Sequence, residues 1–513
     1  MPQAGSNAPF ARTGSGDVMG IWDGDLAVFD GIPFAAPPIG ELRFAGPLPH
    51  PGWTGVLDVA GGPCCPQPAS RLEPVMGRPD FEQDEACLTL NIWSPPAVDG
   101  PYPVLVWIHG GGFITGSGSL PFYRGAQLAR DGRLVVVTIN YRLGALGYLY
   151  VPGLVRDQPG AANRGLLDQI AAIRWVRDNI AAFGGDPDAI TVAGQSAGGA
   201  AIAAMMGNSQ ARSLFNRAIL QSPVLGLLTS IDEAAAICDH LLSVLGIRHA
   251  RIAELKAVPI DHLLEAQIAT TKQFARFGAP VGAIQQVVDG TLINTGLTES
   301  ACRAASTGMP VLLGTTRDEM HSFLMQDQTR SCDRLEAQRL LDNARLQGVA
   351  ESLFDAYLLA STRQSPAEAA SAILTDRHFR IPTLEFASAW SAGGGSAYLY
   401  RFDWEPQPGS RYGACHCIDI PFAFNNLEDW QSGSVRPAML DGCDRNEVNR
   451  ITREFQGSWI TFAHSGRPGY GGLPAWPEYT NSTAVSVQFS VEPQLAANPD
   501  HYLTERWNLT EPG

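Results

Sequence analysis

Short runs of consecutive apolar residues recur along this chain of 513 residues. Val104–Ile108 and Leu134–Ile139 are apolar or β-branched throughout, and turn residues bound both runs. Such runs are typical of strands that are buried on both faces of a parallel sheet. Similar runs predict further strands at residues 27–29, 88–93, 189–193, 218–221, 311–314 and 398–402.

Stretches with helical spacing separate these strands. Between residues 165 and 183 the apolar positions share one helix face, and Gly184–Pro187 ends that helix. The alanine-rich run Ala197–Met206 predicts another helix. Strands that alternate with helices indicate an α/β fold with a mostly parallel sheet. The segments at about 230–300 and 325–395 are mainly helical in pattern, and we expect them to cap the carboxyl edge of the sheet.

Composition indicates one large domain. Hydrophobic residues make up 45% of the chain, and no linker divides it, so we expect a single domain over residues 1–513. The formal charge of −15 argues against nucleic acid and anionic membranes as partners. No run is long and apolar enough to span a bilayer. The N-terminus lacks the features of a signal peptide, so we expect a cytoplasmic protein unless a leader was removed.

The nine cysteines do not form the pattern of a disulfide scaffold, because their number is odd and the chain is long. No pair has zinc-ligand spacing with histidines nearby, so we expect no metal and no cofactor. Any chemistry would then depend on side chains and backbone alone.

The stretch Gly194-Gln195-Ser196-Ala197-Gly198 is the clearest sign of chemistry. It joins a β-branched run to the alanine-rich helix, and a serine between two glycines at such a turn is typical of a nucleophile elbow. Side chains at either glycine would collide with the neighbouring strand and helix. The helix start supplies N–H groups where an oxyanion would form. A chance match is the alternative in a chain with 54 glycines, and the surrounding motifs argue against it.

A second glycine motif follows the strand predicted at residues 104–108. His109-Gly110-Gly111-Gly112-Phe113 frees several N–H groups to point at one spot, as in the oxyanion loop of lipases and esterases. A flexible turn is the alternative, but a turn seldom needs three glycines. We expect His109 to anchor this loop rather than to carry a proton.

An activated serine also needs a base and a group that orients the base. His416 is the favoured base, because a loop of small residues can present its ring to a cleft. The acid is expected after the strand at 311–314, at the edge where open α/β sheets bind ligands. Asp318 and Glu319 both qualify there, and the physical chemistry of the sequence does not separate them.

Together these motifs resemble the type-B carboxylesterase family, which includes cholinesterases and bacterial p-nitrobenzyl esterases. The resemblance covers nearly the whole chain and is specific in order and spacing. It implies an α/β-hydrolase fold, with a central mixed, mostly parallel sheet, flanking helices and helical cap insertions. The matching residues are 31–35, 42–44, 87–91, 109–113, 140–144, 163–169, 183–187, 194–198, 221–222, 316–319, 416–424, 459–466 and 476–477.

The resemblance also assigns roles to individual residues. The triad it implies is Ser196, Glu319 and His416. The oxyanion donors it implies are the N–H groups of Gly111, Gly112 and Ala197. The structural ion pairs it implies are Arg43–Glu85 and Arg142–Asp168. The family's first disulfide would match Cys65–Cys87, a pair that can stay open in a reducing cytoplasm.

Departures from the family pattern narrow the range of substrates that we expect. The segment between Cys65 and Cys87 lacks the choline-binding tryptophan of cholinesterases, and Gln195 replaces their acidic residue before the nucleophile. Choline esters are therefore rejected. Pro223 and Cys417 resemble a bacterial subgroup that includes a phenylcarbamate hydrolase.

The resemblance predicts a bacterial serine hydrolase that cleaves small to medium carboxylic esters through an acyl-enzyme. Aryl carbamates or amides are the alternative substrates. An interfacial lipase and a non-catalytic adhesion-type module are less favoured, the module because this chain keeps the whole triad. Phe113 and Phe323 are expected to line an apolar pocket. We expect a small-molecule substrate and a monomer or weak homo-oligomer.

Overall fold

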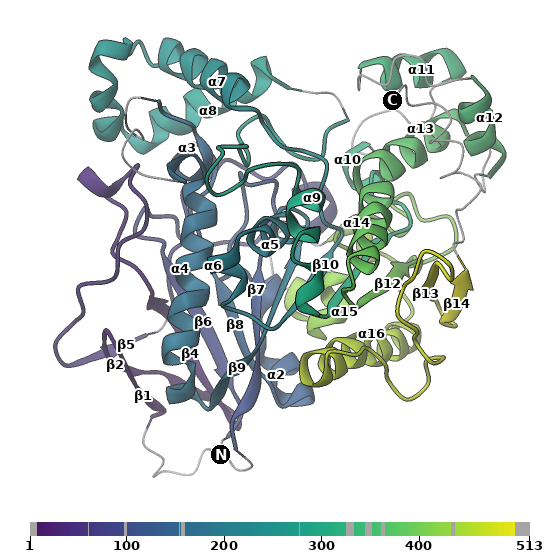
Figure 1. Ribbon diagram of the computed structural model, residues 1–513, viewed down its shortest axis with the longest axis horizontal. Coiled ribbons are helices and arrows are strands. Elements are labelled where there is room, and N and C mark those ends of the chain that lie inside the picture. Colours follow the sequence, from purple (N-terminus) through teal and green to yellow (C-terminus); the bar gives the residue numbers. More distant parts are fainter. Residues whose placement is uncertain are drawn as a thin grey trace.

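The computed structural model describes residues 8–59, 61–96, 100–152, 154, 160–275, 278–324, 333–343, 351–360, 365–431 and 437–497. An eleven-stranded sheet crosses the molecule in the order β14-β13-β12-β11-β10-β9-β7-β8-β6-β4-β3 (Figure 1). Its strands are β3 (Ile21–Asp23), β4 (Leu26–Pro33), β6 (Thr89–Ser94), β7 (Tyr102–Ile108), β8 (Val135–Ile139), β9 (Gly185–Gln195), β10 (Arg217–Gln221), β11 (Val311–Thr316), β12 (Ala397–Phe402), β13 (Val485–Phe489) and β14 (Gln494–Ala497).

The neighbouring strands from β13 to β8 all run parallel. The strands at both edges pair antiparallel with their neighbours, so the sheet is mixed but mostly parallel. The expected α/β architecture is confirmed. The eight strands expected from apolar runs are present, and several extend a few residues beyond those runs.

Helices cover both faces of this sheet, and further helices lie at one end of the molecule (Figure 1). They are α1 (Glu73–Met76), α2 (Ala126–Gly132), α3 (Gly144–Tyr148), α4 (Arg164–Asn179), α5 (Ala197–Gly207), α6 (Ser209–Arg212), α7 (Ile231–Val244), α8 (Ile260–Gln273), α9 (Leu297–Cys302), α10 (His321–Leu324), α11 (Arg334–Asn343), α12 (Glu351–Ala360), α13 (Pro366–Thr375), the π-helical turn η8 (Asp376–Arg380), α14 (Ile381–Ala392), α15 (Ile420–Phe424) and α16 (Arg445–Ser465).

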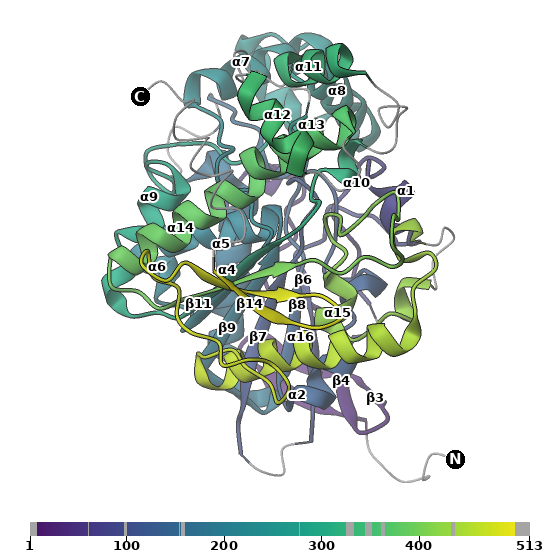
Figure 2. The ribbon, with the colours of Figure 1, turned by 90° about the vertical axis from the view of Figure 1, so that its right-hand side faces the viewer.

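Alternate side chains of the central strands enter two separate cores. Val104, Val106 and Ile108 of β7 pack into the core that also holds residues of α4 and α5. Leu105 and Trp107 of the same strand point the opposite way, into a core with α2 and α16. Figure 2 shows α16 running across the sheet beside α2. Because successive side chains point to opposite faces, a sheet covered on both sides needs unbroken apolar runs.

The two segments expected as caps are largely helical where the structure describes them. α7 and α8 belong to the first segment, and α11 to α14 belong to the second. Figure 1 shows α7 and α8 at the upper left and α11 to α13 at the upper right. The parts of these segments that lie outside the described residues are 276–277, 325–332, 344–350 and 361–364.

Some elements have no counterpart in the sequence prediction. A separate three-stranded sheet joins β1 (Phe10–Thr13), β2 (Gly16–Met19) and β5 (Val56–Asp58). The long helix α16 and the edge strands β13 and β14 were also not expected. In the part of the chain that the structure describes, no helix combines the length and apolar character that crossing a membrane requires.

Candidate active site

Ser196 occupies the sharp turn between β9 and α5. Its backbone has φ 56° and ψ −118°, a strained conformation for a residue with a side chain. A Cβ on Gly198 would lie 2.1 Å from the carbonyl oxygen of Ile108, and one on Gly194 would lie 2.8 Å from the carbonyl carbon of Gly198. The turn therefore needs both glycines, as the sequence predicts. Because α5 begins at the next residue, its positive dipole end lies beside the serine.

Glu319 and His416 are joined by a short hydrogen bond. Oε2 of Glu319 lies 2.5 Å from Nδ1 of His416, and Oε1 accepts a bond from the N–H of Thr316 at 2.8 Å. Both side chains are almost fully buried. A carboxylate on Nδ1 orients the ring and favours the tautomer whose Nε2 can accept a proton. The structure thus brings Glu319, rather than Asp318, to the imidazole.

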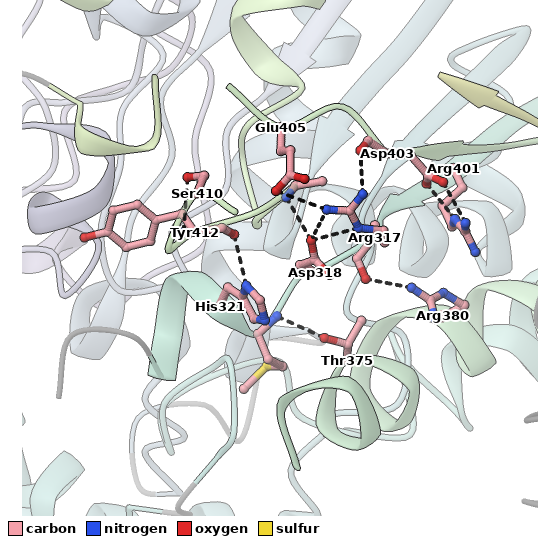
Figure 3. A network of polar contacts seen from close by, with 12 residues as sticks. Arg317, Asp318, His321, Thr375, Arg380, Arg401, Asp403, Glu405, Ser410 and Tyr412 are labelled. Atoms are coloured by element: carbon pink, nitrogen blue, oxygen red, sulfur yellow. Dashed lines mark hydrogen bonds and ion pairs between the residues drawn. The ribbon is translucent and has the colours of Figure 1, made fainter. Parts of the chain in front are cut away.

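Asp318 instead holds the loop that carries His416. Its N–H donates to the oxygen of Ala414, and its Oδ2 accepts from the N–H of Ala414, both at 2.9 Å. Arg317 pairs with the same carboxylate at 2.9 Å (Figure 3). Burial acts to raise the pKa of Asp318, but the charges of His321 and Arg317 outweigh it and lower the pKa. Asp318 is therefore an ionised clamp between the end of β11 and the His416 loop.

The side chain of Gln195 contacts the opposite edge of the imidazole. Its amide nitrogen lies 2.9 Å from Nε2 of His416 and 3.3 Å from Sγ of Cys417. Because Gln195 directly precedes Ser196, Nε2 lies on the elbow side of the ring. Within the described residues, Nε2 bonds to this amide and not to the hydroxyl of Ser196. His416 therefore lies on the side of the elbow, and its Nε2 is already engaged by Gln195.

The loop after β7 packs directly against the elbow. A Cβ on Gly110 would lie 3.1 Å from Cβ of Ser196, so the loop backbone reaches the nucleophile. Gly111 and Gly112 have φ of 115° and 62°, a region that favours glycine. Among the residues that the structure describes, neither of their N–H groups donates to a protein acceptor. Unused N–H groups beside the serine, together with the start of α5, suit the binding of an oxyanion.

His109 anchors this loop. Its ring stacks on Tyr141 with centroids 4.3 Å apart, and the hydroxyl of Tyr141 donates to the carbonyl oxygen of His109 at 2.8 Å. Burial lowers the pKa of His109 to about 4. The ring is therefore neutral at pH 7 and serves the structural role that the sequence indicates.

Two phenylalanine rings pack against the imidazole of His416. The centroids of Phe323, on α10, and Phe379, on η8, lie 5.3 and 4.9 Å from it. Phe323 is half-buried and can present surface to a substrate. Phe113 is only 1% exposed and packs against Tyr148 at 5.0 Å. The structure thus brings Phe323 against the imidazole of His416, whereas Phe113 belongs to the hydrophobic core.

Two arginine–carboxylate pairs tie the N-terminal third together. Arg43 binds Glu85 through two hydrogen bonds of 2.6 Å. Arg142 binds Asp168 at 2.7 and 2.6 Å, and the side chains of this second pair are 1% and 0% exposed. Arg142 also donates to the carbonyl oxygen of Ala45 at 2.7 Å. The buried pair therefore joins α4 to the strand-rich N-terminal segment.

Cys65 and Cys87 are buried neighbours that carry free thiols in this structure. The N–H of Leu143 donates to Sγ of Cys65 at 3.3 Å. A hydrogen bond with Cys65, together with burial, raises the pKa of Cys87 well above its usual value. Their pairing as a disulfide remains a prediction that thiol titration of the purified protein tests. Cys332 lies outside the described residues.

Another buried carboxylate lies near Glu319. Asp419 is fully buried, and the hydroxyl of Tyr400 donates to its Oδ2 at 3.4 Å. Burial, with a further contribution from the charge of Glu319, raises the pKa of Asp419 to about 7. A second negative charge behind Glu319 is thus costly, and Asp419 is partly protonated at neutral pH.

The site's features define a class of protein. A buried carboxylate orients a histidine beside an elbow serine, and unused N–H groups lie next to that serine, which is the arrangement of a serine hydrolase. The model of the carboxylesterase family matches residues 7–507. The chain belongs to the carboxylesterase family.

Individual relatives agree with this assignment. A phenmedipham hydrolase of Pseudarthrobacter oxydans is 38% identical over 505 residues, which cover 96% of this chain and 98% of the relative. A para-nitrobenzyl esterase of Bacillus subtilis is 35% identical, with 94% and 95% covered. The crystal structure of a carboxylesterase from Geobacillus stearothermophilus superposes with a TM-score of 0.84 at 35% identity, covering 97% and 99%. This protein is a carboxylesterase-type serine hydrolase that acts on carboxylic esters.

Several residues of the site were missed by sequence reasoning. Phe379 belongs to a helical stretch without a motif, and only the tertiary fold brings it to His416. The contact of Gln195 with His416 follows from its place beside Ser196, so the elbow motif itself was the available signal. The adjacent acids Asp318 and Glu319 were both candidates. They have different partners, Ala414 and His416, because their side chains leave the turn in different directions.

Proposed function

We propose that Ser196 is the nucleophile, His416 the general base and Glu319 the residue that orients and stabilises the imidazole. The observation that carries this assignment is the 2.5 Å contact between Glu319 and His416, with Nε2 of the ring on the side of the elbow. A buried carboxylate at that position favours the imidazolium that forms when the serine loses its proton.

The proposed reaction is an acyl transfer through Ser196. When a substrate binds, the amide of Gln195 leaves Nε2, and the Ser196 hydroxyl donates to that nitrogen. His416 takes the proton as the serine oxygen attacks the carbonyl carbon, and the carbonyl oxygen becomes an anion. His416 next donates the proton to the departing alcohol, which leaves an acyl-enzyme. Water repeats the sequence, with its proton taken by His416, and releases the acid.

The tetrahedral oxyanion is held by backbone donors. We assign the N–H groups of Gly111, Gly112 and Ala197 to this role, supported by the contact of the loop with Ser196 and by the absence of protein acceptors for Gly111 and Gly112 among the described residues. Each well-placed donor of this kind contributes about 3–4 kcal/mol to transition-state stabilisation.

The substrates we expect are aryl and alkyl esters of small to medium size. Aryl carbamates are the second candidate, because the relative that shares 38% identity is a phenmedipham hydrolase. The same triad would transfer a carbamoyl group to Ser196. Comparing kcat/KM on a matched phenyl ester, anilide and phenylcarbamate decides between these substrates. Size-exclusion chromatography tests the proposal that the protein is a monomer or weak homo-oligomer.

Covalent labelling tests the nucleophile directly. A fluorophosphonate probe should add one phosphonyl group to the peptide that contains Ser196, as read by mass spectrometry. Ser196→Ala should abolish the label, whereas Ser213→Ala, at an exposed serine, should retain it. Labelling of another residue, or full labelling of Ser196→Ala, would contradict the assignment.

A further inference from the structure

Arg71 connects two chain segments that lie far from it in the sequence. Its Nη2 donates to the carbonyl oxygens of Ala279, at 2.9 Å, and of Pro280. Its Cζ lies 4.7 Å from the centroid of the Phe323 ring. Carbonyl oxygens and an aromatic face are both attracted to a cation, so these contacts fix the place of the guanidinium.

Both of the segments that Arg71 contacts also border the reacting groups. The ring of Phe323 lies 5.3 Å from the ring of His416. On the other side, a Cβ on Gly112 would lie 3.7 Å from the carbonyl oxygen of Pro280. Arg71 therefore contacts the ring that packs on the base and the carbonyl that packs on the oxyanion loop. Its charge is thus one contact away from the groups that pack on His416 and on Gly112.

The surroundings of Arg71 strengthen the effect of its charge. The side chain is exposed to solvent, yet burial lowers its pKa to about 10. Protein atoms therefore lie close to a guanidinium that solvent still reaches. The guanidinium keeps its charge at neutral pH, and charges attract more strongly where water is partly excluded. Its planar donor fork matches the geometry of a carboxylate.

We propose that Arg71 determines specificity by favouring esters that carry a carboxylate remote from the scissile bond and by disfavouring cationic esters. The proposal rests on the proposed function, because Ser196 and His416 define where the ester carbonyl lies. Arg71 does not take part in the chemical steps.

Three esters of matched length test the preference on the acyl side. They are mono-p-nitrophenyl adipate, p-nitrophenyl heptanoate and p-nitrophenyl 5-(trimethylammonio)pentanoate, which are anionic, neutral and cationic. On the alcohol side, 3-acetoxyphenylacetate is compared with 3-acetoxytoluene. The wild type should show the highest kcat/KM for the anionic member of at least one series and the lowest for the cationic ester. Added NaCl should weaken the preference.

Variants separate the charge of Arg71 from its packing. Arg71→Met should lower the anionic-to-neutral ratio of kcat/KM by about tenfold or more, the effect of one charge-assisted hydrogen bond. Arg71→Lys keeps the charge and should keep most of the preference. Arg12→Met changes the net charge equally at an exposed site and should leave the ratio unchanged.

These experiments distinguish a failure of the Arg71 proposal from a failure of the proposed triad. A wild type without preference for the anion in either series would overturn the proposal, even if Arg71→Met does not fold. An equal loss of activity on all esters in Arg71→Met would also overturn it, because that indicates packing alone. If Ser196→Ala still turned over these esters, the proposed function itself would fail.

Discussion

The side-chain amide of Gln195 lies 2.9 Å from Nε2 of His416, the ring nitrogen that we propose as the acceptor of the Ser196 proton. On the opposite edge, Glu319 lies 2.5 Å from Nδ1. Both nitrogens of the imidazole are therefore engaged before substrate arrives. The amide of Gln195, the residue before Ser196, therefore occupies the ring nitrogen that the proposed proton transfer from Ser196 requires.

Replacement of this amide by a carboxylate should change the pH profile. In Gln195→Glu, an anion next to Nε2 favours the imidazolium, so the base is lost at a higher pH than in the wild type. The acidic limb of kcat/KM should move up by about 1 pH unit or more. Hydrolysis of phenyl acetate, followed in a pH-stat from pH 5 to 9, measures the shift. Superimposable acidic limbs would show that the side chain at 195 does not act on the base.

The oxyanion loop should tolerate alanine unequally at its two donor positions. A Cβ on Gly111 would lie 2.0 Å from the carbonyl oxygen of Thr115, whereas one on Gly112 meets its nearest atom at 3.7 Å. Gly111→Ala must displace the loop and should lower kcat by about 10²-fold or more, the cost of a lost donor. Gly112→Ala should lose less. Steady-state kinetics measures kcat of both variants, and thermal unfolding checks that they are folded. Equal losses of kcat in the two variants would contradict this account.

The buried ion pair should matter far more than an exposed one. Arg142→Met leaves Asp168 without its partner in the interior and should reduce the free energy of unfolding by about 3–5 kcal/mol. Arg12→Met breaks an exposed pair with Asp17 and should cause no measurable change. Denaturant unfolding of both variants makes the comparison. Equal stability of Arg142→Met and the wild type would show that Asp168 finds another partner.

Asp419 should make stability depend on pH near neutrality. The pKa of its carboxyl is about 7 in the folded protein because of burial, against about 4 in an unfolded chain. The folded state therefore binds more protons between these values, and this group makes folding less favourable as pH rises. Asp419→Asn removes the effect, so its stability relative to the wild type should increase from pH 5 to pH 8. A relative stability that is constant or falls with pH would exclude this role.

The sheet and the elbow were predictable because local sequence determines them. Strands buried on two faces must be apolar throughout, and the turn at Ser196 excludes any side chain at Gly194 and Gly198. The sequence therefore displays both features. The small N-terminal sheet was not predictable in the same way, because its strands are short and partly exposed and have no continuous apolar run.

The choice between Asp318 and Glu319 could not be made from the physical chemistry of the sequence alone. Both acids follow the same strand, and only the tertiary structure decides that Glu319 meets His416 while Asp318 clamps Ala414. The resemblance to the carboxylesterase family also assigns the acid of the triad to Glu319. The expected lining of a pocket by Phe113 and Phe323 stays a prediction; the ring of Phe323 packs against the imidazole, and the ring of Phe113 is buried against Tyr148.

The activity of purified Ser196→Ala on p-nitrophenyl acetate tests the central claim most directly. Without its nucleophile the triad cannot form an acyl-enzyme, and kcat should fall by about 10⁴-fold or more while the protein stays folded. A folded Ser196→Ala enzyme whose kcat is within about tenfold of the wild type would contradict the account.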